Sequence, residues 1–276
     1  TLHCSSAASD VYKRQASSNI AIGSSAMIQH TTGARNIAIG HAAMDDTDAG
    51  SNSLGSSDNI FIGYNAGGGT WADVASIQNV VIGNNSADAS FSGANYNVGM
   101  GTNVYGALTQ GDANSAFGHG SLTALTTGGS NVAVGNAAGS TMTGTSNTVL
   151  IGSGAGNAIN STDANGTVAI GYEASYNLTS GANQVSIGYQ AGKALTTAAN
   201  STFIGYQAGL VHTGGNNIAI GDRAFYDTDA GASSLASTKN VAIGNRALAG
   251  TLTDAAVVGT VALGYYALGN ATMGGI

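Results

Sequence analysis

Apolar and polar residues alternate in short stretches that end on a glycine and return with a period of about 17 residues. One copy of this pattern is Asn36, Ile37, Ala38, Ile39 and Gly40. The period is too long for one strand and too short for a domain, so it predicts an all-β parallel solenoid with one coil per repeat. The glycines that end the fourteen copies are Gly23, Gly40, Gly63, Gly83, Gly101, Gly118, Gly135, Gly152, Gly171, Gly188, Gly205, Gly221, Gly244 and Gly264.

Within each copy, two apolar positions flank one small residue. The residue directly before the glycine is always apolar, and the residue two positions earlier is Ile or Val in all but two copies. Since side chains alternate between the two faces of a strand, the apolar pair shares one face. We therefore predict that Ile37, Ile39, Ile187 and Ile204 are buried and that the intervening residue, such as Ala38, faces outward.

The polar and glycine positions predict how successive coils join. Asn stands four residues before the glycine in nine copies, as at Asn36, and amides stacked at the strand spacing of about 4.8 Å can hydrogen-bond as a ladder. Gly40, Gly188 and Gly205 are predicted to permit a turn that a Cβ would forbid. An alanine three residues later, such as Ala43, predicts a close-packed inner corner. We expect two short strands and two turns in each coil.

The repeat sets the domain organisation. Residues 1–18 lie outside it, and the run from Ser9 to Gln15 is typical of a translated adaptor, with a genuine flexible segment as the alternative. Residues 19–276 are predicted to form one solenoid domain. Two intervals, from Gly40 to Gly63 and from Gly221 to Gly244, are longer than all others and contain nearly the same loop. This longer period of about ten coils predicts that the sequence is part of a longer fibre.

Composition excludes several classes of function. A net charge of −7 and a pI near 4.8 argue against nucleic-acid binding, which requires a basic surface. No apolar run of about 18 residues occurs, so no membrane span is predicted in this segment. The single cysteine, Cys4, cannot form an internal disulfide. A coil this short buries little apolar surface, so its stability must depend on neighbouring coils, and lateral association of several chains is expected.

Two neighbouring copies of the pattern resemble a known family. They are the runs from Gln184 to Gly192 and from Ser201 to Gly209. Both resemble the head repeats of trimeric autotransporter adhesins and the related repeats of phage tail-fibre-like proteins. The resemblance covers residues 19 to about 270. It implies a left-handed parallel β-roll, three chains side by side, and a role as an extracellular fibre or adhesin; the coils here are longer on average than the compact adhesin repeat.

The titratable residues do not predict a catalytic site. The chain has one Glu, and its five His fall in different registers of the repeat, whereas hydrolases need facing carboxylates or a nucleophile beside a His and an acid. We therefore predict a non-enzymatic protein without a cofactor. The weak candidates for Ca²⁺ ligands are Asp46, Asp48, Asp227 and Asp229 in the two long loops, with turn-forming Asp as the alternative.

Tyrosines form a further column. Tyr172, Tyr189 and Tyr206 directly follow the glycine in three successive coils. Such a ladder could face a glycan, but tyrosines also cover sheet edges and seams between chains, and we favour this structural interpretation.

These observations predict a structural or adhesive fibre segment at the cell surface, in the extracellular space or on a virion. Its partners would be further copies of itself, as a homotrimer or a homopolymeric filament, and possible receptors are a cell-surface glycan or a protein. The alternative from another class is an ice- or glycan-binding solenoid. Ice binding would require a flat Thr row, whereas the outward column is expected to be mostly Ala.

Overall fold

The computed structural model describes residues 18–30, 32–47, 55–71, 74–226, 237–250 and 257–269. The chain divides into two compact units, one formed by residues 1–137 and 141–144 and the other by residues 138–140 and 145–276. The described part is almost entirely strands and turns. This confirms the predicted all-β parallel solenoid with one coil per repeat.

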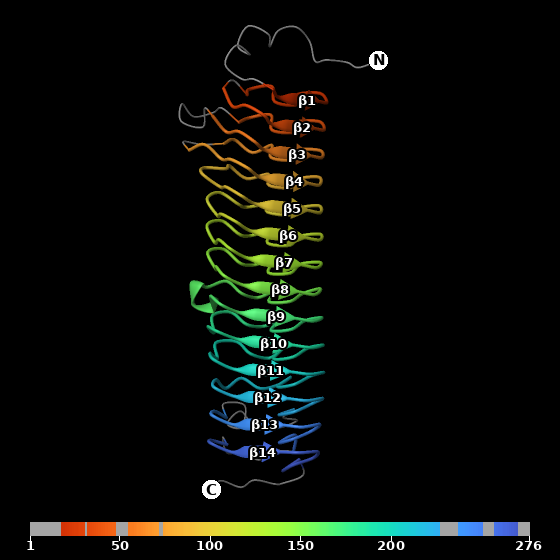
Figure 1. Ribbon diagram of the computed structural model, residues 1–276, viewed down its shortest axis with the longest axis vertical. Helices are drawn as coiled ribbons and strands as arrows, with labels where there is room; N and C mark the ends of the chain where they lie inside the picture. Colours follow the sequence, from red (N-terminus) through yellow and green to blue (C-terminus); the bar gives the residue numbers. More distant parts are fainter. Residues whose placement is uncertain are drawn as a thin grey trace. The chain divides into compact units, whose positions relative to one another are not determined.

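Within the described residues, each unit has seven three-residue strands that follow one another in chain order (Figure 1). All pairings within a unit are parallel, and equivalent residues of successive coils lie opposite one another, as Ile37 does with Ile60. The first unit holds β1 (Ile20–Ile22), β2 (Ile37–Ile39), β3 (Ile60–Ile62), β4 (Val80–Ile82), β5 (Val98–Met100), β6 (Ser115–Phe117) and β7 (Val132–Val134). The second holds β8 (Val149–Ile151), the 3-10 helix η2 (Thr162–Ala164), β9 (Val168–Ile170), β10 (Val185–Ile187), β11 (Thr202–Ile204), β12 (Ile218–Ile220), β13 (Val241–Ile243) and β14 (Val261–Leu263).

The predicted direction of the strand side chains is wrong. The middle residue of nearly every strand is buried, as Ala38 is in β2, whereas Ile37 and Ile39 on either side of it remain partly exposed. Ile187 and Ile204 show the same reversed pattern in β10 and β11. The interior of the coil is shared with buried residues of the turn after the strand, such as Met44 and Leu122, and the middle strand residue is the one that completes it. The outward rows are therefore the Ile and Val rows.

The interior of each coil is shared by two positions six residues apart. Ala116, in the middle of β6, is followed by the buried Leu122. At Gly99, in the middle of β5, a Cβ would lie only 2.7 Å from the ring of the buried Tyr105. In the coil of β8 the strand residue, Leu150, is the large one and the turn residue, Gly156, is the small one. A Cβ at Gly156 would lie 2.8 Å from Leu150. In these coils a large residue at one of the two positions accompanies a small one at the other, whereas the pairs Ala133 with Gly139, Ala169 with Ser175 and Ser186 with Gly192 are small at both.

The second side of each coil differs from our expectation of a second strand. In the described residues, each coil has one strand, and the segment after the glycine contains residues with positive φ, such as Asn103 at 56° and Tyr105 at 57°. These backbone angles interrupt an extended strand. The backbone N–H and C=O groups of this segment still form hydrogen bonds with the neighbouring coils. For example, Ala107 N donates to Thr123 O at 2.8 Å.

The recurring glycines and alanines occupy the predicted places. Gly40 has a φ of +140° and Gly188 one of +135°, a region open only to glycine. A Cβ at either position would also overlap the carbonyl oxygen of the glycine one coil further on. Ala43 and its equivalents Ala66, Ala138, Ala174, Ala191, Ala208 and Ala247 are fully buried at the inner corner.

Candidate functional site

The asparagine column is a buried hydrogen-bonded ladder in the first unit. Asn59 Nδ2 donates to Asn36 Oδ1 at 3.1 Å, and Asn79 Nδ2 donates in turn to Asn59 Oδ1 at 3.0 Å. The bonds continue at 2.9 to 3.0 Å through Asn97, Asn114 and Asn131. Each oxygen also accepts the backbone N–H of the next coil's Asn, as Asn36 Oδ1 does from Asn59 N at 3.0 Å. The ladder thus joins the coils and satisfies buried amides.

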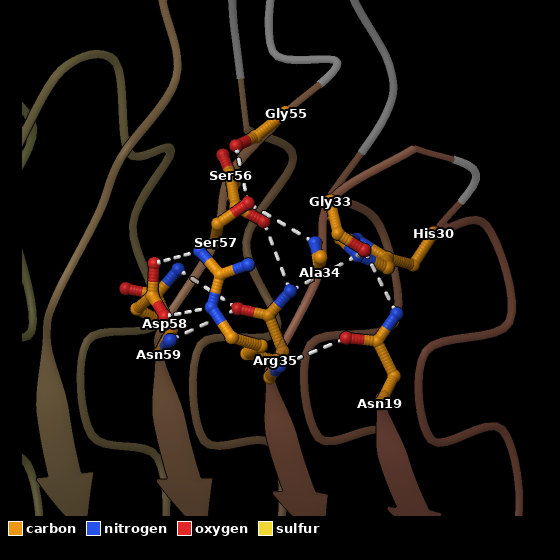
Figure 2. A network of polar contacts seen from close by, with 11 residues as sticks. Asn19, His30, Gly33, Ala34, Arg35, Gly55, Ser56, Ser57, Asp58 and Asn59 are labelled. Atoms are coloured by element: carbon orange, nitrogen blue, oxygen red, sulfur yellow. Dashed lines mark hydrogen bonds and ion pairs between the residues drawn. The ribbon is translucent and has the colours of Figure 1, made fainter. Parts of the chain in front are cut away.

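Polar contacts surround the beginning of this ladder (Figure 2). Asn19 Nδ2 donates to the carbonyl oxygen of Gly33 at 2.8 Å, and Asn19 Oδ1 accepts the backbone N–H of Asn36 at 2.8 Å. On the surface beside them, Arg35 forms a two-bond ion pair with Asp58 from the next coil. This pair raises the pKa of Arg35 and lowers that of Asp58. These contacts join neighbouring coils, and each of the two charges is already paired with the other.

The most extensive surface feature is the pair of outward Ile and Val rows, which we call the apolar face. It consists of the first and third residues of each strand. Ile20 and Ile22 are 48% and 49% exposed, and Met100 is 50% exposed. Further members with at least a third of their surface exposed are Val98, Phe117, Val132 and Val134 in the first unit, and Ile151, Ile218, Ile220, Ile243, Val261 and Leu263 in the second. Each unit therefore presents a long apolar strip without a covering layer in the single chain.

The tyrosine column forms a stack in the second unit. The ring centroids of Tyr172 and Tyr189 are 5.3 Å apart with an interplanar angle of 17°, and those of Tyr189 and Tyr206 are 5.3 Å apart at 11°. The three side chains are 43% to 46% exposed. Because both faces of the Tyr189 ring are covered by its neighbours, a sugar ring cannot stack on them. The exposed parts of Tyr189 are its ring edge and its hydroxyl group.

A polar column runs beside the tyrosines. Gln190 Nε2 donates to Glu173 Oε2 at 2.9 Å, and Gln207 Nε2 donates to Gln190 Oε1 at 3.1 Å. Lys193 Nζ lies 2.6 Å from Glu173 Oε2, and this bond lowers the pKa of Glu173. At the other end, Arg223 Nε donates to Gln207 Oε1 at 3.2 Å. The column places a carboxylate at one end of the tyrosine stack and a guanidinium at the other.

The calcium candidates are only partly described. Asp46 Oδ2 accepts a hydrogen bond from Thr70 Oγ1 at 2.6 Å, and this bond joins two neighbouring coils. Asp48, Asp227 and Asp229 lie outside the described residues. Within the described ranges, no group of three or more His, Cys, Asp or Glu side chains could hold a metal ion. The Ca²⁺ assignment therefore stays a prediction.

One histidine is buried in the core of the second unit. The ring of His212 lies 4.1 Å from that of Phe225 and 6.3 Å from that of Phe203, measured between centroids. Its Nε2 is 2.8 Å from the carbonyl oxygen of Ser237, while Nδ1 has no hydrogen-bond partner among the described residues. Burial lowers the pKa of His212 to about 4. In other coils the same position holds Leu178 or Leu195, so His212 occupies a core position with no substrate access.

Sequence reasoning missed the partners of the tyrosine stack. Arg223 Cζ lies 5.2 Å from the centroid of the Tyr206 ring and 5.9 Å from that of Tyr226. Lys193 Nζ similarly lies 5.9 Å from the Tyr176 ring centroid. The signal was present, because Glu173, Gln190, Gln207 and Arg223 all stand two residues after the recurring glycine in successive coils.

The fold and these surfaces define a parallel β-solenoid repeat protein. No protein-family model, curated protein or solved structure matches the chain. In the parts of the chain that the structure describes, no helix is long and apolar enough to cross a membrane.

Proposed function

We propose that this chain is a non-enzymatic structural segment of an extracellular, cell-surface or virion fibre, in which copies of the chain associate side by side through the apolar face. The observation that carries the proposal is the exposure of both outward rows, as in Ile20 and Ile22 of β1 and Ile218 and Ile220 of β12. The resemblance to trimeric autotransporter heads and phage tail fibres supports three chains in the assembly.

The size of the apolar face favours a covered state. At roughly 50 Å² for each half-buried side chain, the thirteen apolar members in β1 to β7 present on the order of 650 Å². Monomeric proteins rarely expose a contiguous apolar patch of more than a few hundred Å², and each partner in a stable interface contributes about 800 Å². The patch therefore has the size expected of an interface.

A second copy is the partner that fits this face best. Equivalent side chains recur once per coil because successive strands are paired in register, so another copy presents the same repeat. Charge does not oppose this contact, because the outward positions of the strands carry no Lys, Arg, Asp or Glu. Knob-and-groove packing between two such faces would bury the Ile and Val rows that a single chain leaves in water.

The alternative ligand-binding functions have less support. A flat Thr row is absent from the outward positions of the described strands, where Thr202 is the one threonine. The middle ring of the tyrosine stack, Tyr189, offers its edge and hydroxyl rather than its faces, so it is not a stacking platform of the kind that aromatic sugar sites use. We therefore place adhesion, if a receptor is bound, outside these two surfaces.

The test is the mass of the assembly in solution, measured by sedimentation or light scattering on the full chain. We expect a homo-oligomer, and a trimer if the resemblance extends to assembly. A double variant, Ile218→Lys with Ile220→Lys, should reduce the mass toward one chain, whereas Thr127→Lys on an exposed turn should not. A monomeric wild-type protein at micromolar concentration would refute lateral association. Long continuous filaments in electron micrographs would instead identify end-to-end assembly.

A further inference from the structure

We propose that the stack of Tyr172, Tyr189 and Tyr206 is a site of oxidative cross-linking, at which a one-electron oxidant of the peroxidase and hydrogen peroxide class joins neighbouring rings as dityrosine. The proposal is independent of lateral assembly. It rests on three observations: the rings of successive coils are parallel and adjacent, their edges are exposed, and the groups at the two ends of the stack differ in charge.

Proximity is the first requirement for coupling. Two phenoxyl radicals join through a bond between ring carbons next to the oxygen-bearing carbon, so the rings must meet without moving the backbone. Centroid distances of 5.3 Å from Tyr189 to both neighbours meet this condition. Tyr172 and Tyr206 are two coils apart, at about twice the strand spacing of roughly 4.8 Å, so they cannot couple directly while the fold is intact.

The reaction balances with the named oxidant. Each of two tyrosines loses one electron and its phenol proton, and hydrogen peroxide takes up both electrons and both protons to form two water molecules. The two radicals then form one carbon–carbon bond. The hydrogens on the joined carbons move to the oxygens as the rings regain aromaticity, so the product has lost two hydrogen atoms in total.

Glu173 places a proton acceptor at one end of the stack. Glu173 directly follows Tyr172 in the chain, and its carboxylate raises the pKa of the Tyr172 phenol. Lys193 and Gln190 hold the carboxylate ionised and in place. Loss of an electron makes a phenol strongly acidic, and a neighbouring carboxylate can then accept its proton. Tyr172 should therefore be oxidised most readily.

Arg223 has the opposite effect at the other end. Its guanidinium carbon lies 5.2 Å from the centroid of the Tyr206 ring. A fixed positive charge at this distance opposes removal of an electron from Tyr206. The stack is thus asymmetric, and the Tyr172 to Tyr189 link should form in preference to the Tyr189 to Tyr206 link.

The cross-link would tie two consecutive coils of the second unit through their side chains. Tyr172 follows β9 and Tyr189 follows β10, strands that are held together by backbone pairing. A covalent bond at this point resists separation of the coils under load or heat. Such a modification suits a protein exposed to an oxidising environment.

The experiment treats the dilute full-length chain with a haem peroxidase and hydrogen peroxide. Dityrosine fluorescence, intact mass and peptide mapping are measured on the band that runs as one chain in a denaturing gel. We expect the loss of two hydrogen atoms and mainly Tyr172 to Tyr189 links. Tyr189→Phe keeps the stacked ring but removes the phenol, so it should abolish these links within one chain. Tyr96→Phe, which removes an exposed tyrosine outside the stack, is the matched control and should leave them unchanged.

A further variant tests the role of the carboxylate. Glu173→Gln preserves the size of the side chain and should shift the mapped products from the Tyr172 to Tyr189 link toward the Tyr189 to Tyr206 link. A purely structural role of Glu173 would lower both links together. Links spread evenly over all exposed tyrosines, or an undiminished single-chain yield in Tyr189→Phe, would overturn the proposal.

Discussion

Phe61 and Gly67 share one space inside the third coil. A Cβ added to Gly67 would lie 2.7 Å from the Phe61 ring, which is fully buried between strand and turn. In the coil of β6 the same two positions hold Ala116 and Leu122 with the sizes reversed. The interior volume of a coil is therefore divided between one strand residue and one turn residue.

This exchange predicts a compensating pair of substitutions. Phe61→Ala should lower the free energy of unfolding by about 3–5 kcal/mol, because it leaves a cavity beside Trp71 and Phe91. Adding Gly67→Leu should recover a large part of that loss. Leucine is compatible with this backbone, since Leu122 has a φ of 49° at the equivalent position and Gly67 has one of 65°. Thermal and denaturant unfolding of Phe61→Ala, Gly67→Leu and the double variant would measure this recovery. If the losses of the two single variants simply add in the double variant, the two side chains do not share one volume.

The asparagine ladder predicts a penalty for losing one amide. Asn97→Ala removes a buried acceptor and donor, so the N–H of Asn114 and the carbonyl oxygen of Gly111 lose the hydrogen bonds that the Asn97 amide provides. Asn79 Oδ1 keeps its bond from the backbone N–H of residue 97. Each unsatisfied buried group costs about 1–3 kcal/mol, so the melting temperature should fall by several degrees. The control is Asn136→Ala, which removes only an exposed contact to His119. Equal melting temperatures for the two variants would show that the ladder adds little stability.

The glycine at the end of each strand predicts strong intolerance to a single methyl group. Gly188→Ala should destabilise the second unit severely, because its φ of +135° is unfavourable for alanine and the new Cβ would overlap the carbonyl oxygen of Gly205. Gly120→Ala is the comparison. Its φ of +64° is also left-handed, but the nearest atom to a new Cβ is 3.5 Å away, so its cost should be about 1 kcal/mol. The melting temperatures of the two variants can be measured by circular dichroism during heating.

His212 predicts a dependence of stability on pH. Its pKa is about 4 in the folded protein and 6.5 in its ordinary state, because burial disfavours the charged ring. The packed rings of Phe203 and Phe225 carry no charge, and the polar neighbours are Asn217 and the Ser237 carbonyl. The unfolded chain binds the proton more readily, so this contribution is complete above pH 6.5 and is lost as the pH falls from 6.5 toward 4.

The matched variant for this prediction is His212→Leu, which places at this position the residue found at Leu195. Its melting temperature should fall less than that of the wild type between pH 7 and pH 4.5. At pH 4, the wild type should have lost at most roughly 3 kcal/mol more of its free energy of unfolding than His212→Leu. Parallel curves for the two proteins over this range would contradict a neutral buried histidine.

Much of the fold could be predicted because the repeat leaves few alternatives. The positions of Gly40 and its equivalents fix one coil per repeat, and the recurring Asn36 column locates the amide ladder. The direction of the strand side chains could not be deduced from hydrophobicity alone, since Ala38 is less apolar than Ile37 and Ile39. The interior next to Ala38 also holds the buried Met44, six residues later, and single-strand periodicity does not contain that information.

The sequence predicts which residues of the site recur in register along the coils, but it does not predict the contacts between their side chains. The register of Tyr172, Tyr189 and Tyr206 follows from the period, whereas the covered ring faces depend on rotamers that place each ring over the next. The register of Arg223 follows from the same period, whereas its position against the Tyr206 ring depends on the rotamers of the two side chains.

The exchange of volume between Phe61 and Gly67, or between Ala116 and Leu122, takes place inside one coil. Copying or removing such a coil as a whole conserves the volume of the exchanged pair, and the aromatic contacts to the next coil, such as Phe61 to Phe91, are what a neighbour must still match. Tandem duplication or deletion of complete repeats can therefore change the length of such a gene product without a new search for a compatible core. Lengthening in whole coils is the evolutionary path that this interior leaves open.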